Sequence, residues 1–554
     1  MADLYGRQAF LELLASEGVT HLFGNPGTTE LPIMQAVPEY PQIKFVLGLQ
    51  EAVVVAMADG FARASRSLAA ANVHVAPGLG NAMGALYNAK FSGSPVILTA
   101  GQQEQGHGLL EPLLYEPLPP IAAPLVKWAV EVTRVEDLPR VMRRAAKVAM
   151  TRPMGPVFIS LPGDILNARA ELDLGMRVRI DDRVRPSDAA VDAIAAMLLS
   201  ARRPAIIAGQ EIAIHGAFAQ AGELAGLMGA AVFQEPIPYA AAFPTAHPQY
   251  VGMLTRSQAQ VHAALEPYDM VLCLGADLLR MSVYSPVEPL PAHVQVVHLS
   301  ERAWELGKSY RTDLAVAANV RETLDALLPA LKAGADAGYR AAAAERCARV
   351  AVENWQVRRA QGAAQTVLRE SASPMDPAAL MLRIADNLPA DAIVVEEALT
   401  SSIKLPQFMH QRDESSLFGL ASGGLGFAVP GAVGISMAKP GRPVVAIVGD
   451  GSAMYGIQGL WTAAHFRLPI TYVITNNRSY RIIKERLVAM QGSDRFVGMD
   501  MRDPAIDFCR LAESFGLATL RVTNLADVGP ALKAAIASGR PNLIDMAVAY
   551  GFGA

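Results

Sequence analysis

Residues 444–452 read Val-Val-Ala-Ile-Val-Gly-Asp-Gly-Ser, and residues 470–477 read Ile-Thr-Tyr-Val-Ile-Thr-Asn-Asn. Both stretches begin with a short apolar run, which is typical of a strand buried in a parallel sheet. Asp450 and Asn477 follow these runs, so both lie where the carboxyl ends of parallel strands form a ligand-binding crevice. The two stretches therefore predict a doubly wound α/β domain with a polar site at one edge of its sheet.

The polar residues of these stretches have the chemistry of a magnesium and diphosphate site. Asp450 and Asn477 offer hard oxygen ligands, and Mg²⁺ keeps its remaining positions for waters and phosphate oxygens. Gly451 has no side chain and lets the backbone approach a diphosphate closely. The alternative is an ordinary strand–turn–helix with an incidental Asp and Asn. The placement of both residues behind strands favours the magnesium–diphosphate site.

The composition is that of a large enzyme made of several domains. The chain has 554 residues, 52% of them hydrophobic, and this length suggests three to four domains. A net charge of −4, with both signs interspersed, gives no indication of nucleic-acid binding. No apolar run reaches the length of a membrane span, and residues 1–7 lack the pattern of a secretory signal. We expect a cytoplasmic protein that binds neither nucleic acid nor membrane.

The cysteines add no site of their own. Cys273, Cys347 and Cys509 lie far apart and have no metal-ligand spacing. Cys273 sits in the apolar run 270–274, so we expect a buried and inert thiol. This cysteine usage fits a reducing cytoplasm.

The chain is expected to form three doubly wound α/β domains with parallel sheets. Strand-like apolar runs alternate with helical patterns along the chain. Residues 1–180 are predicted to be the first domain, 188–330 the second and 373–554 the third. Residues 331–372 are rich in Ala and Arg, and we expect them to be a helical connector. Buried strands are predicted at 21–24, 44–49, 69–74, 95–100, 156–161, 204–209, 271–275, 294–299, 392–396, 444–448 and 470–474.

Further motifs give the chain a family resemblance. The first domain carries Phe23-Gly24-Asn25-Pro26-Gly27-Thr28, Leu49-Gln50-Glu51-Ala52, His74 and Gly78-Leu79-Gly80-Asn81-Ala82-Met83-Gly84, and the third carries Gly423-Gly424-Leu425-Gly426-Phe427-Ala428. Together with the Asp450 and Asn477 stretches, they resemble the thiamine-diphosphate-dependent decarboxylase superfamily, and within it the benzoylformate decarboxylases. The resemblance is strong over 20–105 and 420–480 and weaker elsewhere.

The resemblance implies an architecture and cofactors. The three domains are expected to be a pyrimidine-binding, a central and a diphosphate-binding domain, and the cofactors thiamine diphosphate and Mg²⁺. The active sites of the family lie between two subunits, which implies a homodimer or homotetramer. Neither glycine-rich stretch gives a G-x-G-x-x-G after a first strand, so a nicotinamide site is not expected.

The resemblance also implies catalytic roles in the first domain. Glu51 matches the glutamate that lies against the aminopyrimidine ring and favours its imino tautomer. His74 matches one of two histidines that transfer protons, and histidine titrates near neutrality. Thr28 stands where benzoylformate decarboxylases have Ser, and its extra methyl group narrows the pocket. The alternatives are a helix-terminal Glu favoured by the dipole and a structural His.

The cofactor and metal contacts are likewise carried over from the family. Leu425, between two glycines, matches the bulky side chain beneath the bent cofactor, and core packing is its alternative role. Residues implied to bind the cofactor are Glu51, Asn81, Thr400, Gly424, Leu425, Gly451, Ser452 and Tyr480. Residues implied to bind the metal are Asp450, Asn477 and Ser479.

Besides Thr28, the substrate pocket departs from the family in two further places. Ser282, within residues 275–284, stands at the position of the second histidine, and a hydroxyl cannot titrate near pH 7. This leaves room for slow decarboxylation, for carboligation, or for cleavage of a 2-hydroxy ketone or 2-hydroxyacyl thioester. His107, in the glycine-flanked loop 105–108, is a candidate replacement.

The pocket wall forms the second departure. Leu113 and Leu114 match apolar lining positions, whereas Ile482 replaces a small residue and Arg486 an aromatic one. The basic side chains of the segment could hold an anionic substrate group, or they could form a solvated helix face. These side chains are Arg481, Lys484 and Arg486.

These observations predict a thiamine-diphosphate- and Mg²⁺-dependent carbon–carbon lyase. Non-oxidative decarboxylation of a 2-oxo acid to an aldehyde and CO₂ is the first expectation, and the substrate is a small 2-oxo acid, aldehyde or acyl compound. A carboligase, or a 2-hydroxyacyl or 2-hydroxy-ketone lyase, is the second. Acyl transfer of the acetolactate-synthase type is the third, although no flavin motif is seen. A catalytically silent subunit is the fourth, and Glu51 with its intact metal pair argues against it.

Overall fold

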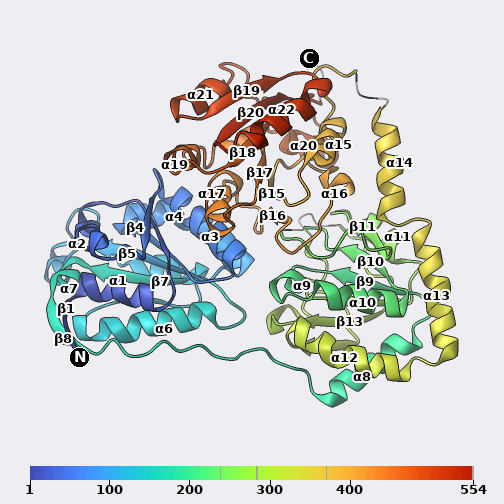
Figure 1. Cartoon of the computed structure of the whole chain (residues 1–554), viewed down its shortest axis with the longest axis horizontal. Helices are drawn as coiled ribbons and strands as arrows, with labels where there is room; N and C mark the ends of the chain where they lie inside the picture. Colours follow the sequence, from blue (N-terminus) through green and yellow to red (C-terminus); the bar gives the residue numbers. More distant parts are fainter. Residues whose placement is uncertain (238, 282–284, 368, 370, 552–554) are drawn as a thin grey trace.

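The computed structural model describes residues 1–237, 239–281, 285–367, 369 and 371–551. Within them the chain forms three six-stranded sheets in which every pairing of neighbouring strands is parallel. Figure 1 shows the first domain at the left, the third at the top and the central domain at the right. The predicted fold class, three doubly wound α/β domains, is confirmed. A short antiparallel pair, β1 (Ala2–Tyr5) with β8 (Arg169–Leu172), closes the edge of the first domain.

The first sheet has the order β3-β2-β4-β5-β7-β6. Its strands are β2 (His21–Gly24), β3 (Lys44–Leu47), β4 (Ala69–His74), β5 (Val96–Gln102), β6 (Ala129–Glu131) and β7 (Val157–Pro162). The helices of this domain are α1 (Gly6–Ser16), α2 (Leu31–Ala36), α3 (Glu51–Ser65), α4 (Val75–Ser92), α5 (Leu118–Ala122), α6 (Leu138–Met150) and α7 (Gly163–Asn167). Apolar runs such as 96–100 are buried on both faces because helices cover both sides of the sheet.

The third sheet has the order β16-β15-β17-β18-β20-β19, which is the strand order of the first sheet repeated. Its strands are β15 (Ile393–Glu397), β16 (Leu417–Gly419), β17 (Val444–Gly449), β18 (Ile470–Asn476), β19 (Ala518–Val522) and β20 (Asn542–Ala547). Its helices are α15 (Pro377–Asn387), α16 (Leu405–Phe408), α17 (Ala428–Ala438), α18 (Asp450–Ala453), α19 (Gly459–His465), α20 (Arg481–Gln491), α21 (Phe508–Ser514) and α22 (Leu525–Ala537). Corresponding strand ends of the two sheets can therefore be compared directly.

The central sheet differs, with the order β11-β10-β9-β12-β13-β14. Its strands are β9 (Pro204–Ala208), β10 (Ala231–Gln234), β11 (Tyr250–Met253), β12 (Met270–Leu274), β13 (Gln295–Ser300) and β14 (Leu314–Ala317). Its helices are α8 (Asp188–Ser200), α9 (Glu211–Ile214), α10 (Phe218–Met228), α11 (Gln258–Leu265) and α12 (Val320–Gly334). The order reverses between β9 and β12, and such a switch point is where open α/β sheets bind ligands.

Two segments link the domains. Residues 173–187 are extended and run along one side of the molecule from the first domain to the central one (Figure 1). After α12 the chain forms α13 (Ala337–Ala351) and α14 (Trp355–Val367), as the predicted helical connector requires. Trp355 is buried and donates from its indole nitrogen to the Pro406 carbonyl at 2.9 Å, which fixes α14 against the third domain. The precise domain boundaries remain predictions.

The first and third domains share a close helix-to-helix contact. A Cβ on Gly60 of α3 would collide with the Gly431 carbonyl, and one on Gly434 of α17 would collide with the Met57 carbonyl. The two backbones therefore touch, and only glycine permits this approach. Arg63 is half-buried beside the contact and donates to the Gly419 carbonyl at 3.0 Å. One continuous apolar core joins the two domains.

Among the described residues, none of the helices combines the length and the apolar character that a membrane crossing requires.

Candidate active site at the carboxyl ends of two sheets

Asp450 begins the short helix α18 directly after β17 and is 3% exposed. One carboxylate oxygen accepts the N–H of Gly451 at 2.8 Å, and the other accepts the N–H of Arg478. Burial raises the pKa of the Asp450 carboxyl to about 6, and the backbone hydrogen bonds oppose this rise. A bound cation would favour the ionised form, so the environment suits a metal ligand.

Asn477 follows the adjacent strand β18, at the same edge of the sheet. Its Oδ1 is buried and has no hydrogen-bond partner among the residues that the structure describes. An orphaned carbonyl oxygen beside a carboxylate fits a hard divalent cation, because burial without a partner is costly. Among the described residues, no group of three His, Cys, Asp or Glu is placed to hold a metal ion. The carboxylate of Asp450 and the amide oxygen of Asn477 are oxygen donors of the kind that suits Mg²⁺. The Ser479 hydroxyl donates to the Met499 carbonyl at 3.1 Å.

The start of α18 forms a cradle with little space for side chains. A Cβ on Gly451 would lie 2.7 Å from a ring carbon of the half-buried Tyr480. Ser452 follows within the same buried helix start. This cradle fits a diphosphate, which would need close backbone approach and the N–H groups of a helix start.

Leu425 lies in the glycine-rich loop between β16 and α17. Gly426 has φ +105°, a conformation that a side chain would strain. Both oxygens of Glu397 hold the loop, accepting the N–H groups of Gly426 and Ala428 at 2.6 Å each. Burial raises the pKa of the Glu397 carboxyl to about 7, against the effect of these hydrogen bonds. Thr400 lies half-buried in the turn after Glu397.

Glu51 is the first residue of α3, after the end of β3. The Gln50 side chain caps this helix by accepting the Ala52 N–H at 2.6 Å, which fixes the direction of the helix start. Asn81 of α4 donates to one Glu51 oxygen at 3.0 Å. A Cβ on Gly78 would lie 3.1 Å from the other oxygen, so glycine leaves space beside the carboxylate. The structure thus brings Glu51 and Asn81 together.

His74 ends β4 and is held by a carboxylate that the sequence reasoning missed. Glu30 is 0% exposed, and its Oε2 lies 2.7 Å from Nδ1 of His74. The two Glu30 oxygens also accept the N–H groups of Gly27 and Gly101 at 2.8 Å each. Because a carboxylate only accepts hydrogen bonds, Nδ1 of His74 carries the proton, and Nε2 remains the acceptor in the neutral ring. Thr29 contacts the same nitrogen at 3.1 Å.

The turn before Glu30 and the turn after His74 both have unusual backbone features. A Cβ on Gly27 would collide with the imidazole of His74, so glycine lets the turn pack on the ring. Val75, a β-branched residue, has φ +42°, a region that such residues avoid. Strain of this kind costs about 1–3 kcal/mol and is found at functional sites. Thr28 is exposed next to this turn.

The loop after β5 carries the predicted apolar lining. Leu113 is 84% exposed and Leu114 also lies at the surface, with φ +71°. His107 is exposed in the same loop. Leu113, Leu114 and His107 are thus open to solvent in this chain, so a lining role would need another surface to cover them.

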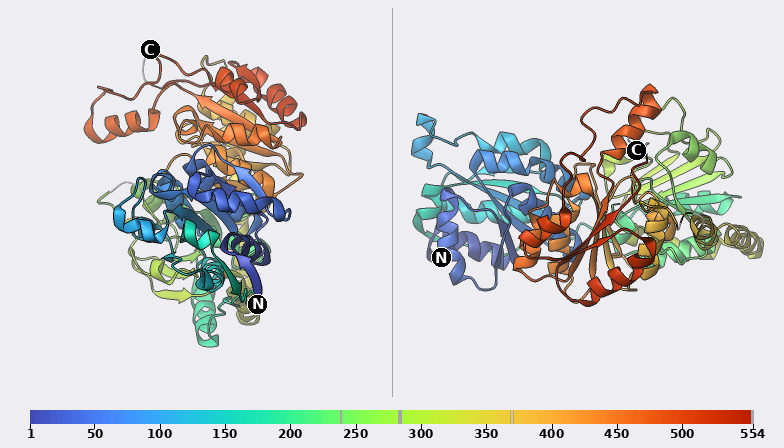
Figure 2. Two further views of the ribbon diagram at one scale, coloured as in Figure 1. Left: turned by 90° about the vertical axis from the view of Figure 1, so that its left-hand side faces the viewer. Right: turned by 90° about the horizontal axis from the view of Figure 1, so that it is seen from above.

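Helix α20 carries the predicted polar wall and projects from the third domain, as Figure 2 shows in orange-red. Lys484 is fully buried, and its amine donates to both oxygens of Asp500 at 2.8 and 2.9 Å. Arg481 pairs with Glu485 at 2.8 Å. These two basic groups are neutralised within the domain. Ile482 and the exposed Arg486, four residues apart, share another face of the helix.

Arg486 has a basic neighbour that no sequence pattern indicated. Arg256 follows β11 of the central domain and is exposed to solvent. Burial by the surrounding protein lowers the pKa of the Arg256 guanidinium, Glu396 raises it and Arg486 lowers it further. Within the described part of the chain, neither arginine has an ion pair or a side-chain hydrogen bond.

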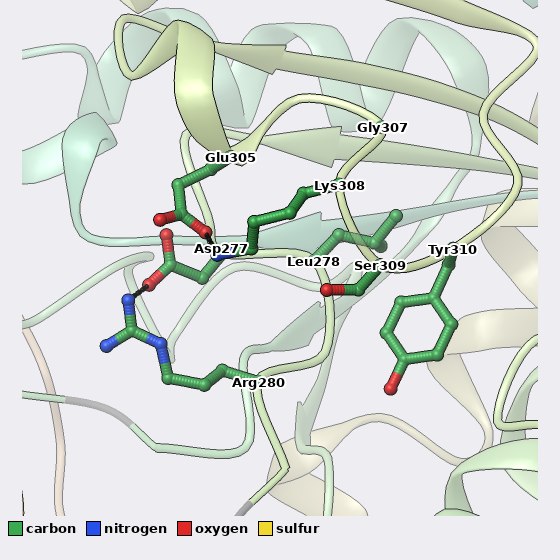
Figure 3. Close-up of a pocket in the computed structure, with 8 residues that line it drawn as sticks. All are labelled: Asp277, Leu278, Arg280, Glu305, Gly307, Lys308, Ser309 and Tyr310. Carbon is green, nitrogen blue, oxygen red and sulfur yellow. Dashed lines mark hydrogen bonds and ion pairs between the residues drawn. The ribbon is translucent and has the colours of Figure 1, made fainter.

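The predicted Ser282 lies outside the described residues. The segment before it borders a small cavity of the central domain, shown in Figure 3. Its charged groups are already paired, Arg280 with Asp277 and Lys308 with Glu305. This cavity is therefore no substitute for the crevice of the other two sheets.

The predicted residues form two groups within one chain. Glu51, Asn81 and His74 belong to the first domain, and Asp450, Asn477 and the Leu425 loop to the third. Among the described residues, no hydrogen bond or ion pair joins a predicted residue of one group to one of the other. Sequence reasoning missed Glu30, Glu397 and Arg256. An acidic residue next to a strand end is the signal that could have found the two glutamates.

Three family models match the chain in order. The models are described as the N-terminal TPP binding domain, the central domain and the C-terminal TPP binding domain of thiamine pyrophosphate enzymes. They match residues 4–111, 191–327 and 400–546. The first and third matches contain the two groups of site residues.

Individual relatives span the whole chain. Benzoylformate decarboxylase of Pseudomonas aeruginosa is 33% identical over 541 residues, which cover 97% of this chain and 98% of that protein. The structure of the thiamine diphosphate-dependent 4-hydroxybenzoylformate decarboxylase of Rhodococcus jostii RHA1 matches with a TM-score of 0.88 at 32% identity, covering 99% of each chain. Glyoxylate carboligase of Escherichia coli O157:H7 is 26% identical over 554 residues, covering 97% of this chain and 91% of that protein.

Proposed function

This chain belongs to the family of thiamine pyrophosphate enzymes, and on that premise we propose that it decarboxylates a 2-oxo acid without oxidation, releasing an aldehyde and CO₂. The similarity to two decarboxylases supports this reaction. The similarity to a carboligase makes carboligation, or cleavage of a 2-hydroxyacyl or 2-hydroxy-ketone compound, the second candidate.

The observation that carries the proposal is the orphaned Asn477 oxygen beside the buried Asp450. These two residues would hold Mg²⁺, and Ser479 is a further proposed ligand. Gly451 and Ser452 would accept the diphosphate against Tyr480. When bound, thiamine diphosphate supplies the carbon nucleophile and the electron sink that C–C bond cleavage needs.

The first domain would supply the proton-transferring groups. Glu51 presents a carboxylate whose position is fixed by Asn81, and it would hold the aminopyrimidine by a hydrogen bond. His74 would transfer protons at Nε2, because Glu30 occupies its Nδ1. Thr28, an exposed residue, would contact the substrate.

We propose that the active site forms between two subunits of a cytoplasmic homodimer or homotetramer. The two groups of site residues are not joined within one chain, so a second copy would complete each site. Large apolar side chains near both groups are exposed, which supports a covering partner. These side chains are Leu109, Leu110, Leu113, Ile403 and Tyr455.

The substrate is proposed to carry a second anionic group. Arg486 and Arg256 are two cations within electrostatic reach of each other. The Glu396 carboxylate acts on Arg256, but neither arginine has an ion pair or a side-chain hydrogen bond among the described residues. Guanidinium groups in this arrangement suit a carboxylate or phosphate. A plain aryl 2-oxo acid would leave Arg486 without an anionic partner.

The acyl-transfer candidate with a flavin has less support. At the switch point of the central sheet, Glu211 opens the first helix after β9 and is 2% exposed. Its carboxylate accepts from the Ser300 hydroxyl at 2.6 Å and from Arg302 at 3.2 Å. A buried carboxylate where a dinucleotide places its diphosphate would repel that ligand.

A panel of 2-oxo acids tests these proposals. The protein is incubated with thiamine diphosphate and Mg²⁺, and CO₂ and aldehyde are measured together. Equal amounts of both products support a decarboxylase. Cofactor binding without CO₂ from any acid would overturn it in favour of the carboligase or 2-hydroxyacyl lyase.

A second comparison tests the substrate class. We expect Arg486→Ala to lower kcat/KM about 10- to 100-fold for acids with a second carboxylate or phosphate, since a charge-assisted contact is worth about 1.5–3 kcal/mol. The same substitution should change kcat/KM little for 2-oxo acids with an uncharged side chain, such as benzoylformate. Arg540→Ala, which changes an exposed arginine of the third domain, is the control. Equal losses for both classes of acid would refute the anion contact.

A further inference from the structure

A buried side chain of the first domain holds the loop of the third domain that carries Leu425. Asn88 lies on α4 and is 2% exposed. Its Oδ1 accepts the backbone N–H groups of Ala421 at 3.0 Å and Ser422 at 3.1 Å. The Ser422 hydroxyl donates to the same oxygen at 3.2 Å. Three donors from one loop therefore converge on one carbonyl of another domain.

The orientation of this amide is fixed from behind. Nδ2 of Asn88 donates to Asp59 at 2.8 Å, and Asp59 is 0% exposed. A carboxylate cannot donate, and a backbone N–H cannot accept, so the amide can face these groups in one direction only. The hydroxyl of Ser92 also donates to Asp59 at 2.9 Å, which keeps the carboxylate in place. Asp59 lies on α3, the helix that begins with Glu51.

The hydrogen bonds continue to the residue before Leu425. The Ser422 hydroxyl accepts the N–H of Gly424 at 3.1 Å. On the other side of Leu425, the N–H of Gly426 binds Glu397. Leu425 is thus held between two polar anchors, one in its own domain and one in the first domain. A loop with two glycines at positive φ would otherwise have many accessible conformations.

We propose that Asn88 is a positioning residue of the active site, which fixes residues 421–425 so that Leu425 stands beneath the bound cofactor. The inference rests on the proposed role of Leu425 as the cofactor's support. It goes further by placing the control of that support in the other cofactor-binding domain. A displacement of about 1 Å at such a position can cost about 10²-fold in rate.

The contact requires a side chain at position 88 that accepts hydrogen bonds on one side and donates on the other. Asn88→Leu would leave two buried N–H groups without an acceptor. Asn88→Asp would keep the acceptor but set a second carboxylate against Asp59, and the like charges would repel. Adding Asp59→Asn to Asn88→Asp reverses the donor and acceptor between the two side chains and restores a hydrogen bond. The double variant is therefore a designed rescue.

The test uses the full-length protein without cofactor and has two readouts besides turnover. One is the Kd for thiamine diphosphate at fixed Mg²⁺, measured by calorimetry. The other is hydrogen exchange at residues 421–428. We expect Asn88→Asp to raise the Kd at least 10-fold and to speed exchange at Ala421 and Ser422. The double variant should return the Kd to within 3-fold of the wild type.

Asn542→Ala is the matched control. Asn542 is also a buried asparagine, and its amide donates to the Ala535 carbonyl at 2.9 Å and the Arg540 carbonyl at 2.8 Å, at the amino end of β20. This variant should lower Tm without changing the Kd for the cofactor more than twofold. A positioning role is overturned if Asn88→Asp keeps both the Kd and the exchange rates, or if the double variant recovers neither.

Two other outcomes also test the inference. If Asn88→Asp does not fold, Ser422→Ala decides, because it removes one step of the hydrogen-bond chain at a half-buried position. A 2- to 10-fold higher Kd is then expected, and an unchanged Kd overturns the inference. A wild-type protein that binds the cofactor but decarboxylates no acid would refute the proposed reaction. The positioning role of Asn88 would still be tested, because the Kd of the Asn88 variants is measured without turnover.

Discussion

The first and third domains place a buried glutamate at the same topological position. Glu30 follows β2, and Glu397 ends β15, the first strand of each sheet. Each carboxylate accepts two backbone N–H groups from the turns around its crevice. In both domains the carboxylate at this position holds the backbone of the neighbouring turns in place. The two domains share a strand order, and each uses a buried glutamate for the same structural purpose.

The neighbouring strand ends differ between the two domains. The second and third strands of the first sheet lead to Glu51 and His74, which can exchange protons. In the third sheet the third strand leads to Asp450 and the fourth to Asn477, which can hold a cation. The comparison teaches that strand order fixes where functional groups stand, while the residue at each end decides what it does. It predicts that changes at Glu51 and His74 affect turnover, and that changes at Asp450 and Asn477 affect cofactor binding.

The largest effect is expected for Glu51→Gln. Loss of the carboxylate should lower kcat about 10²- to 10⁴-fold, the range of general acid–base catalysis. The Kd for thiamine diphosphate should change little, because the diphosphate contacts lie in the third domain. Steady-state kinetics and calorimetry measure the two quantities, with the exposed Glu39→Gln as the control. Activity that survives Glu51→Gln would contradict the role of this carboxylate.

Asp450→Asn should have the opposite pattern. Removal of the charged ligand should raise the Mg²⁺ concentration needed for half-maximal cofactor binding at least about 10²-fold, since outer partners of metal ligands alone are worth about 10- to 100-fold. A titration of Mg²⁺ at fixed thiamine diphosphate measures this, and Asp527→Asn on exposed α22 is the control. Normal Mg²⁺ dependence with lost turnover would break the division between the two domains.

Glu30→Gln should lower kcat about 10- to 100-fold, with the Kd for the cofactor unchanged. The amide can donate to Nδ1 of His74, so the ring can take the wrong tautomer and lose its acceptor at Nε2. The pH profile of kcat should change, which a purely structural loss would not cause. An unaltered profile would show that Glu30 supports only the backbone.

Glu397 should give a smaller, pH-dependent effect on stability. Its folded pKa of about 7 lies above the usual 4.5, so the native state binds the proton more tightly than the unfolded chain does. The stabilisation is complete below pH 4.5 and is lost as the pH rises through 7. Calorimetry from pH 5 to 8.5 should show the wild type losing a few degrees of Tm relative to Glu397→Gln. Parallel pH curves for the two proteins would refute the shift.

The smallest effect is expected for Val75→Gly. The substitution relieves the strain at φ +42° but removes a buried side chain, so the two contributions nearly cancel. Val73→Gly removes an equally buried valine of β4 without such relief and should be clearly more destabilising. Thermal unfolding of the two variants makes the comparison. Equal losses would show that Val75 stores no strain.

The sequence predicted most of the strands that are long and apolar, although it missed β20. The runs at 96–100 and 444–448 are buried on both faces, which makes them visible without any partner. Strands β16 and β11 escaped because one has three residues and the other contains a glycine, Gly252. Such strands are defined only by their hydrogen bonds to neighbouring strands, and a local sequence pattern cannot show these bonds.

The site was predictable where the chemistry lies in one short segment. Asp450 and Asn477 follow recognisable strands, and the structure sets them at one crevice. Asn88 was not predictable, because its partner Ala421 lies 333 residues away. Arg256 was hidden for the same reason, since its neighbours belong to another domain. Contacts between domains depend on the folded arrangement, which no local spacing encodes.

The contact between Gly60 and Gly431 has a consequence for how the chain folds. The shared core makes the first and third domains one cooperative unit, although the central domain separates them in the chain. Contacts so distant in sequence form slowly, because a long loop must close first. During synthesis, the apolar α3 face of the first domain therefore stays exposed until the last third of the chain has been made. A fragment that ends near residue 180 would keep this face uncovered and would tend to aggregate.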